Sequence, residues 1–180
     1  MTHTLLEPAR VAAILESFPT QHIVVVGDMV ADEYIFGVPS RISREAPVVV
    51  LEYTGRRFVP GGATNVAVNL RALGAAVSVV GVIGDDASGR ELTRALAALG
   101  IDTGGLVVDA QRPTSTKTRV VGGGAQVARQ QMVRIDRADS SPVHGASRQE
   151  LFTAADHLLT QAGGLILSDY EHGVIDPELI

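Results

Sequence analysis

The chain reads PGGATNVA at residues 60–67 and then, after Gly74, AVSVVGVI at residues 76–83. Apolar residues recur at helical spacing in the first part, which predicts an amphipathic helix over 63–73 with Thr64 as its N-cap and Gly74 at its end. The apolar positions of this helix are Val66, Leu70 and Leu73. The mostly apolar run that follows, with Ser78 as its one polar residue, is typical of a buried strand. A helix leading directly into a buried strand indicates an α/β unit.

The same alternation of strand and helix extends along the rest of the chain. Residues 22–27 form another apolar run ending in glycine, as a buried parallel strand does at a functional edge. The other expected elements are a helix within 5–18, a helix with Leu92, Leu96 and Leu99 on one face, strands at 116–121 and 126–135 around a Gly122–Gly124 turn, a helix at 151–162 and a strand at 164–168. We therefore predict an α/β fold with a largely parallel sheet.

One segment departs from this alternation. Residues 34–36 and 47–53 look like two short strands of a small antiparallel flap, and the polar residues 37–46 look like the link between them. This predicts a small β flap inserted between the first strand and the first core helix.

Bulk composition excludes several functional classes. A chain of 180 residues is one domain by length. Its net charge of −5 argues against nucleic-acid binding, and the absence of cysteine removes disulfides, thiol catalysis and thiolate metal sites. The N-terminal segment is too polar for a signal peptide, and no apolar run reaches the length of a membrane span. These features favour a cytoplasmic protein without nucleic-acid or membrane partners.

The Gly61-Gly62 turn is the leading candidate for a binding site. Glycines let the backbone approach a ligand closely, and the Asn65 side chain in the first helical turn has donors and an acceptor suited to sugar hydroxyls. A plain packing turn explains two adjacent glycines equally simply.

Further candidates follow the strands. Asp28 and Asp32 come directly after the first strand, either as ligand contacts or as turn caps. Asp85 and Asp86 suggest a metal pair but are more typical of capping groups, so no metal site is assigned. Lys117 is the only lysine, against fourteen arginines.

Taken together, the motifs resemble the PfkB (ribokinase-like) carbohydrate kinases, and within them the heptose 7-phosphate kinase branch, which forms half of the bifunctional heptose kinase/adenylyltransferases. The Gly-Gly-Ala-x-Asn-x-Ala spacing from Gly61, with glycines at 74 and 84, is similar to the first signature of that family. The branch is indicated by residues 26–28, 40–43 with 45–47, 130–131 with 134–136, and 167–170.

This resemblance implies a three-layer ribokinase-like fold over residues 1–180, with a lid at about 33–59. It implies ATP and Mg²⁺ as cofactors, a sugar phosphate as substrate and a homodimer formed through the lid. The substrate-binding residues it implies are Asp28, Asp32, Gly61, Gly62, Asn65, Lys117, Gln131 and Arg134, and the implied cofactor-binding residue is Asp169.

Some of these assignments have competing explanations. A solvated strand residue explains Lys117, and edge-strand solubility explains Gln131 and Arg134. Arg41 and Arg44 near the lid are further candidates for the anionic end of a substrate. His172 stands where the heptose kinases usually carry lysine, which puts a role in neutralising nucleotide phosphate in doubt.

The Gly-Ala-Gly-Asp motif that carries the family's catalytic base does not occur among the 180 residues. The resemblance therefore implies that the chain is an N-terminal portion, inactive and poorly stable alone, with its catalytic aspartate expected beyond Ile180. A non-catalytic remnant or a lid-mediated dimerisation module is the alternative. A dinucleotide-binding Rossmann domain fits poorly, since no G-x-G-x-x-G follows the first strand.

Overall fold

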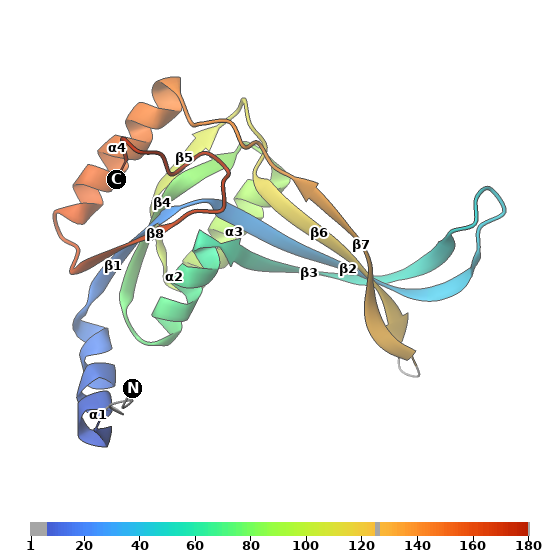
Figure 1. The fold of residues 1–180 in the computed structure, drawn as a ribbon, viewed down its shortest axis with the longest axis horizontal. Coiled ribbons are helices and arrows are strands. Elements are labelled where there is room, and N and C mark those ends of the chain that lie inside the picture. Colours follow the sequence, from blue (N-terminus) through green and yellow to red (C-terminus); the bar gives the residue numbers. More distant parts are fainter. Residues whose placement is uncertain (1–6, 125–126, 180) are drawn as a thin grey trace, which may run out of the picture.

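The computed structural model describes residues 7–124 and 127–179 of the chain (Figure 1). Helices and strands alternate through most of it, as the sequence predicts. The elements are α1 (Pro8–Ser17), a 3-10 turn η1 (Phe18–Thr20), β1 (His22–Gly27), β2 (Met29–Ile42), β3 (Val49–Gly62), α2 (Ala63–Ala72), β4 (Ala76–Gly84), α3 (Ala87–Ala98), β5 (Asp102–Asp109), β6 (Ser115–Gly124), β7 (Val127–Arg137), α4 (Gly145–Leu159) and β8 (Gly164–Ser168).

Four of the strands form a parallel sheet, which we call sheet A, in the order β5-β4-β1-β8. Helices α2 and α3 pack on one face of this sheet and α4 packs on the other. In β1, Val25 belongs to the cluster under α2 and α3, whereas Val24 and Val26 belong to the cluster under α4. The predicted α/β fold with a largely parallel sheet is confirmed, because both faces of β1 are covered and its apolar run is continuous.

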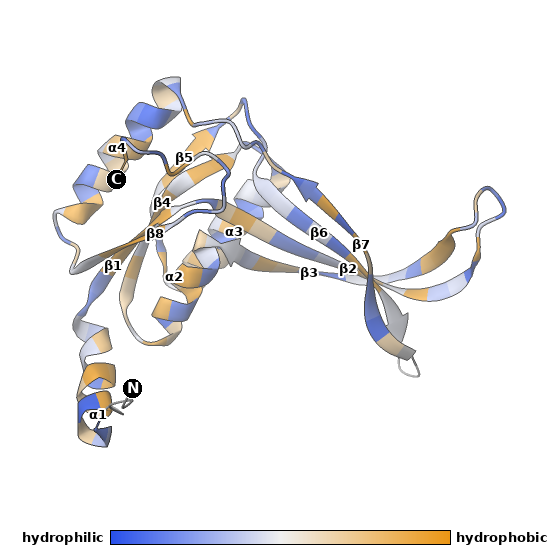
Figure 2. Cartoon of the chain, viewed as in Figure 1, coloured by the Kyte–Doolittle hydropathy of each residue, from blue (hydrophilic) through white to orange (hydrophobic). Residues whose placement is uncertain are grey.

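The other four strands form sheet B, in the order β3-β2-β6-β7. In this sheet β2 pairs antiparallel with β3 and parallel with β6, and β6 pairs antiparallel with β7. Figure 1 shows the β2–β3 hairpin extending away from the helices as a long arm. Figure 2 shows the contrast in composition: sheet A is mostly hydrophobic, whereas hydrophobic and hydrophilic residues are mixed along sheet B.

The predicted lengths of the lid strands are wrong. Strands β2 and β3 each have 14 residues, so most of the supposed link at 37–46 lies in β2. Gly37 and Pro39 suggest a loop in the sequence, but β2 accommodates them with register shifts between Phe36 and Gly37 and between Pro39 and Arg41. Irregularities of this kind let an edge hairpin continue through residues that weaken a regular ladder.

Three other boundaries differ from prediction. Gly122 and Gly124 pair with β7 and so belong to β6, not to a turn. The sequence does not predict strand β5, because Gly104 and Gly105 weaken its strand signal. Close packing against β4 explains Gly105, since a Cβ there would lie 2.6 Å from the carbonyl oxygen of Val79. Helix α4 begins six residues before the predicted 151–162 and ends three residues earlier, since polar residues fill its first turns.

The predicted N-terminal helix is confirmed as α1 where the structure describes it; residues 5 and 6 of the prediction lie outside the described residues. Leu99 does not lie in α3 but follows it, and it is 45% exposed. Gly74, at φ +103°, lies just beyond α2 as predicted. Among residues 7–124 and 127–179, no helix is both long and apolar enough to cross a membrane.

Candidate functional site

Three of the candidate residues, Asp28, Asp32 and Lys117, lie near the junction of sheet A and sheet B. Asp28 is the single residue between β1 and β2, and it is buried. Its carboxylate accepts hydrogen bonds from the backbone N–H groups of Tyr170, His172 and Val174, at 2.7, 3.1 and 3.3 Å. Asp28 thus holds the loop that follows β8. Its predicted contact with substrate stays a prediction.

A second charged side chain holds the same loop from the other side. Nη2 of Arg112 donates to the carbonyl oxygens of Asp139 at 2.7 Å and His172 at 2.9 Å, with a longer contact to Ser141 at 3.3 Å. Nδ1 of His172 is buried and has no hydrogen-bond partner among the described residues. The loop after β8 is therefore bound through its N–H groups by Asp28 and through a carbonyl by Arg112.

Asp32 lies in β2, opposite Lys117 of β6 and Val59 of β3. Nη1 of Arg119 donates to Oδ1 of Asp32 at 2.6 Å, and this hydrogen bond raises the pKa of Arg119 above its ordinary value. Arg119 also lies over the Tyr34 ring, 5.2 Å from its centroid. Side chains alternate along strands, so Asp32 and Tyr34 share one face of sheet B with Lys117 and Arg119.

Lys117 connects this face of sheet B to the loop after β8. Its Nζ lies 5.4 Å from the centroid of the Tyr170 ring, within the range of a cation–π contact. The carboxylate of Asp28 also accepts a hydrogen bond from the N–H of Tyr170. A continuous set of contacts therefore joins the end of β1, the loop after β8 and Lys117 on β6. Lys117 therefore faces the junction between the two sheets.

The glycine turn has a reason within the chain itself. A Cβ on Gly61 would collide with the carboxylate of Asp32, and a Cβ on Gly62 would lie 2.6 Å from Cγ2 of Val30. Gly62 also has φ +54°, a left-handed conformation that favours glycine. These contacts explain both glycines without a ligand, and their binding of substrate remains a prediction.

The predicted N-cap of α2 is wrong. The cap position is Gly62, and Thr64 lies inside the helix and is buried. Its hydroxyl donates to the carbonyl oxygen of Gly61 at 2.6 Å. Gly62 takes the cap position because only glycine adopts its backbone conformation easily.

Asn65 lies in the first turn of α2 and is exposed. Within the described part of the chain its amide makes no hydrogen bond, so its donors and acceptor are free for a ligand. Asp169, just after β8, is also exposed, and its Oδ1 accepts from the N–H of Glu171 at 2.7 Å.

Gln131 and Arg134 lie on β7, at the outer edge of sheet B. Arg134 is opposite Arg119 and donates to Asp136 at 2.9 Å, whereas Gln131 lies beyond a register shift, opposite Val121. Arg134 is thus adjacent to the Asp32 cluster, and Gln131 is farther along the strand. Both residues are exposed.

The structure places Arg41 and Arg44 far from Asp32 of the same chain. Arg41 is nine residues beyond Asp32 in the same strand, and Arg44 lies in the connection at the end of the arm. Nine residues of strand span about 30 Å, so these arginines do not reach a small molecule held by Asp32 of the same chain.

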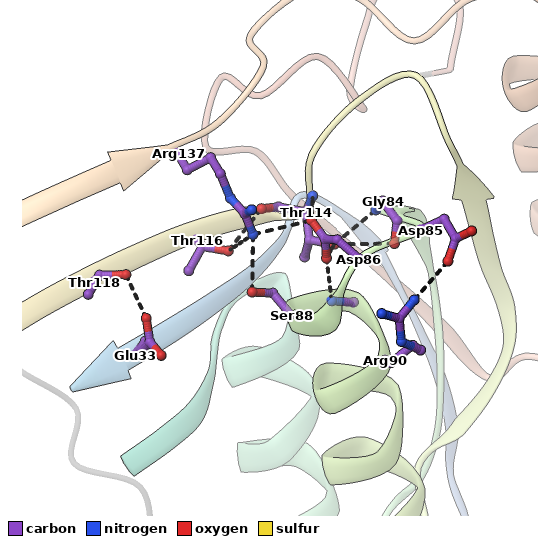
Figure 3. A network of polar contacts seen from close by, with 11 residues as sticks. Glu33, Gly84, Asp85, Asp86, Ser88, Arg90, Thr114, Thr116, Thr118 and Arg137 are labelled. Atoms are coloured by element: carbon purple, nitrogen blue, oxygen red, sulfur yellow. Dashed lines mark hydrogen bonds and ion pairs between the residues drawn. The ribbon is translucent and has the colours of Figure 1, made fainter. Parts of the chain in front are cut away.

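Of the adjacent acids at 85 and 86, Asp86 is a capping group as predicted, whereas Asp85 forms an exposed ion pair and no cap (Figure 3). Asp86 caps α3 by accepting from the N–H of Gly89 at 2.8 Å, and it also accepts from the N–H and hydroxyl of Thr114. Burial alone would raise the pKa of Asp86, but these hydrogen bonds and the nearby Arg137 hold it below its ordinary value. Asp85 pairs with Arg90 at 2.8 Å. No group of three or more metal-ligating residues occurs in the described ranges.

Arg112 and Arg119 are the site residues that the sequence does not single out. Among fourteen arginines, their roles depend on which strands lie side by side, and residue spacing does not specify that. The one available signal for Arg119 is its position two residues from Lys117, which places both on one strand face.

Comparison with known proteins agrees with this arrangement. The model of the "pfkB family carbohydrate kinase" family matches residues 20–171. A "Bifunctional protein HldE" from Azorhizobium caulinodans is 48% identical over 159 residues, and one from Desulfatibacillum aliphaticivorans is 45% identical over 163 residues. These alignments cover 88% and 91% of this chain but 32% of each relative, so the chain spans about a third of their length.

Solved structures show the same fold at lower identity. Arabidopsis thaliana ribokinase complexed with ribose and ATP has a TM-score of 0.55 and 19% identity, and it matches 82% of this chain and 45% of its own. A microbiome-derived acarbose kinase has a TM-score of 0.55 and 22% identity over the same shares. The described fold is ribokinase-like, and the chain belongs to the pfkB family of carbohydrate kinases.

Proposed function

We propose that this chain supplies the sugar-binding half of an ATP-dependent kinase that phosphorylates a sugar or sugar phosphate. The preferred acceptor is a heptose 7-phosphate, converted to the 1,7-bisphosphate. The observation that carries the proposal is the placement of Asp32 beside Lys117, on a sheet face that meets the loop after β8.

Phosphoryl transfer requires an acceptor hydroxyl held in line with the γ-phosphate of ATP. Asp32 offers carboxylate oxygens as acceptors for sugar hydroxyls, and the exposed amide of Asn65 offers donors and an acceptor. Both lie next to the turn at Gly61 and Gly62, which connects β3 to α2. This group fits the task of holding a polyhydroxylated acceptor.

The anionic end of the acceptor is assigned to Lys117. It is the only lysine in the chain, it is partly buried, and its ammonium group has no carboxylate partner in the described structure. A compact ammonium suits a phosphate group. Arg134 on the neighbouring strand adds positive charge, although Asp136 offsets part of it. We therefore prefer a phosphorylated sugar to a neutral one.

The described residues do not fit a Mg²⁺ site, since they contain no suitable group of acidic or histidine ligands and Asp86 is committed to its cap and to Thr114. We assign this chain the acceptor side of the reaction, with Asp169 as its one expected nucleotide contact. The catalytic base and most of the groups that bind ATP and Mg²⁺ are expected from the rest of the parent protein. The 180 residues alone are expected to transfer no phosphate, because neither a catalytic base nor an anion hole for the γ-phosphate is recognised among the described residues.

The test is phosphate transfer by a full-length protein containing this chain. Turnover of heptose 7-phosphate, with little turnover of fructose 6-phosphate or ribose, is the expected result. Turnover of ribose or fructose 6-phosphate alone would reject the substrate, and no turnover of any sugar would reject the kinase.

We further propose a cytoplasmic homodimer formed through the arm. Large apolar side chains are exposed along it, including Tyr53 at 69%, Ile42 at 59% and Val48 at 56%. Sedimentation of the full-length protein is expected to give a dimer that Tyr53→Arg shifts toward monomer. A dimer unaffected by that change would place the interface elsewhere.

The same exposed arm supports a second candidate, a non-catalytic module that dimerises and binds sugar. An in-frame Gly-Ala-Gly-Asp in the coding sequence after residue 180 favours the kinase, whereas a stop codon there favours the module.

A further inference from the structure

We propose that Arg119 is the positioning residue of the sugar site, which fixes the carboxylate of Asp32 so that its free lone pairs face the sugar hydroxyls. This inference rests on the proposed function, because it concerns how the acceptor is held. It assigns Arg119 no direct contact with the substrate.

The contact between the two side chains is short and partly shielded from water. Nη1 of Arg119 lies 2.6 Å from Oδ1 of Asp32, and the side chains are 20% and 21% exposed. Hydrogen bonds between ionised groups are among the strongest in proteins. Where water has limited access, the solvent screens them less than it does at the surface. The carboxylate of Asp32 is therefore turned toward Arg119 on β6.

The other oxygen of Asp32 is also constrained. Oδ2 lies directly over Gly61, in space that any Cβ at that position would occupy. The carboxylate is thus held between Arg119 on one side and the bare backbone of Gly61 on the other. A group fixed from two sides keeps one orientation before the ligand arrives, which lowers the entropy lost on binding.

Arg119 is itself held in place. Its guanidinium lies 5.2 Å from the centroid of the Tyr34 ring, and Nη1 has a second, longer contact with the carbonyl oxygen of Lys117 at 3.5 Å. Tyr34 in turn stacks on Phe36 at 6.3 Å. A planar guanidinium supported by an aromatic ring keeps its direction better than a lysine would.

Sheet B provides a matched control. Arg129 of β7 lies 5.1 Å from the centroid of the Phe36 ring, so it makes the same kind of contact with an aromatic ring as Arg119. Phe36 is four residues beyond Asp32 in β2, about 13 Å along the strand. Replacing Arg129 removes an arginine–aromatic contact without touching Asp32.

The experiment measures sugar affinity of the full-length protein by calorimetry, for heptose 7-phosphate and for the unphosphorylated heptose. The variants are Asp32→Asn, Arg119→Met, Arg119→Lys, the double variant Asp32→Asn/Arg119→Met, Lys117→Met, and the control Arg129→Met. Thermal melts of each variant show that it is folded.

We expect Arg119→Met to weaken both sugars by the same factor, about 10- to 100-fold, with Arg119→Lys intermediate and Arg129→Met unchanged. KM should rise by a similar factor while kcat falls less. The double variant should bind no more weakly than Asp32→Asn alone, because the two residues act as one unit. Lys117→Met should weaken only the phosphorylated sugar.

Three results would overturn the inference. Loss of affinity confined to the phosphorylated sugar in Arg119→Met would make Arg119 a direct phosphate contact. Additive losses in the double variant would show that Arg119 does not act through Asp32. If Asp32→Asn itself leaves sugar affinity intact, the proposed sugar site is wrong. If Asp32→Asn weakens sugar binding but the Arg119 variants leave sugar affinity unchanged, the proposed function stands and this inference fails.

Discussion

Sheet A and the arm of sheet B differ in what holds them together. The central strands of sheet A, β1 and β4, are covered on both faces by helices, and residues such as Val25 and Val79 have no exposed surface. The arm, residues 33–59 of β2 and β3 and their connection, is held mainly by cross-strand hydrogen bonds, and many of its apolar side chains are exposed. The fold of this protein is therefore stabilised by packing at one end and by backbone pairing at the other.

The largest expected effect contrasts core packing with arm packing. Leu96 in α3 is completely buried, and Leu96→Ala should lower the free energy of unfolding by about 2–5 kcal/mol because it leaves a cavity. Ile42 is 59% exposed, so Ile42→Ala should lower the free energy of unfolding by less than about 0.5 kcal/mol. Urea denaturation of the full-length protein measures both. Equal losses would show that the arm is packed against something as closely as the core is.

The next prediction contrasts two glycines of β3. Gly62→Ala should destabilise the protein by about 1–3 kcal/mol, since alanine there takes a left-handed conformation and crowds Val30. Gly55→Ala is the control, because a Cβ at Gly55 meets nothing within 4 Å. Thermal unfolding should separate the two variants clearly. A neutral Gly62→Ala would mean that the turn relaxes easily.

A third prediction concerns binding rather than stability. Asn65→Ala in the full-length protein should weaken sugar binding by about 1–3 kcal/mol, since the sugar loses hydrogen bonds in a shielded site. Its melting temperature and its affinity for ATP should hardly change, because the side chain is exposed in the free protein. Calorimetry that found weaker ATP binding and normal sugar binding would place Asn65 on the nucleotide side.

The smallest effect is a dependence of stability on pH at the start of α3. The pKa of Asp86 is lowered in the folded state, so its stabilising contribution is complete above the ordinary aspartate pKa of about 3.9 and is lost as pH falls through the lower folded value. Asp86→Asn should reduce the acid-side slope of stability against pH, measured by denaturation between about pH 2 and 6. An unchanged slope would show that other carboxylates determine it.

The features that the sequence predicts correctly are those that depend on a few neighbouring residues. The apolar run at 22–27, Gly74 and the capping role of Asp86 are local signals, and the structure agrees with them. They are reliable because a continuous hydrophobic strand, a left-handed residue and a cap each depend on a few neighbouring residues.

The rest depends on register, which a single sequence does not contain. The arm is longer than predicted because Gly37 and Pro39 read as loop residues until their partners on β3 are known. The Asp32–Arg119 pair follows from parallel pairing of β2 with β6, between residues 87 positions apart. Thr64 was assigned the cap because its side chain suits that role, whereas the backbone places Gly62 there.

The two attachments of the arm have a mechanical consequence. Only Asp28 separates β1 from β2, and β3 passes into α2 without any intervening residue. A flap hinged on loops swings as a rigid body, but this hairpin has no loop at its base, and the carboxylate of Asp28 accepts hydrogen bonds from three backbone N–H groups. Movement of the arm over the proposed sugar site therefore requires its strands themselves to bend and twist. We expect such bending to displace the tip of the arm most and Asp32, close to its base, least.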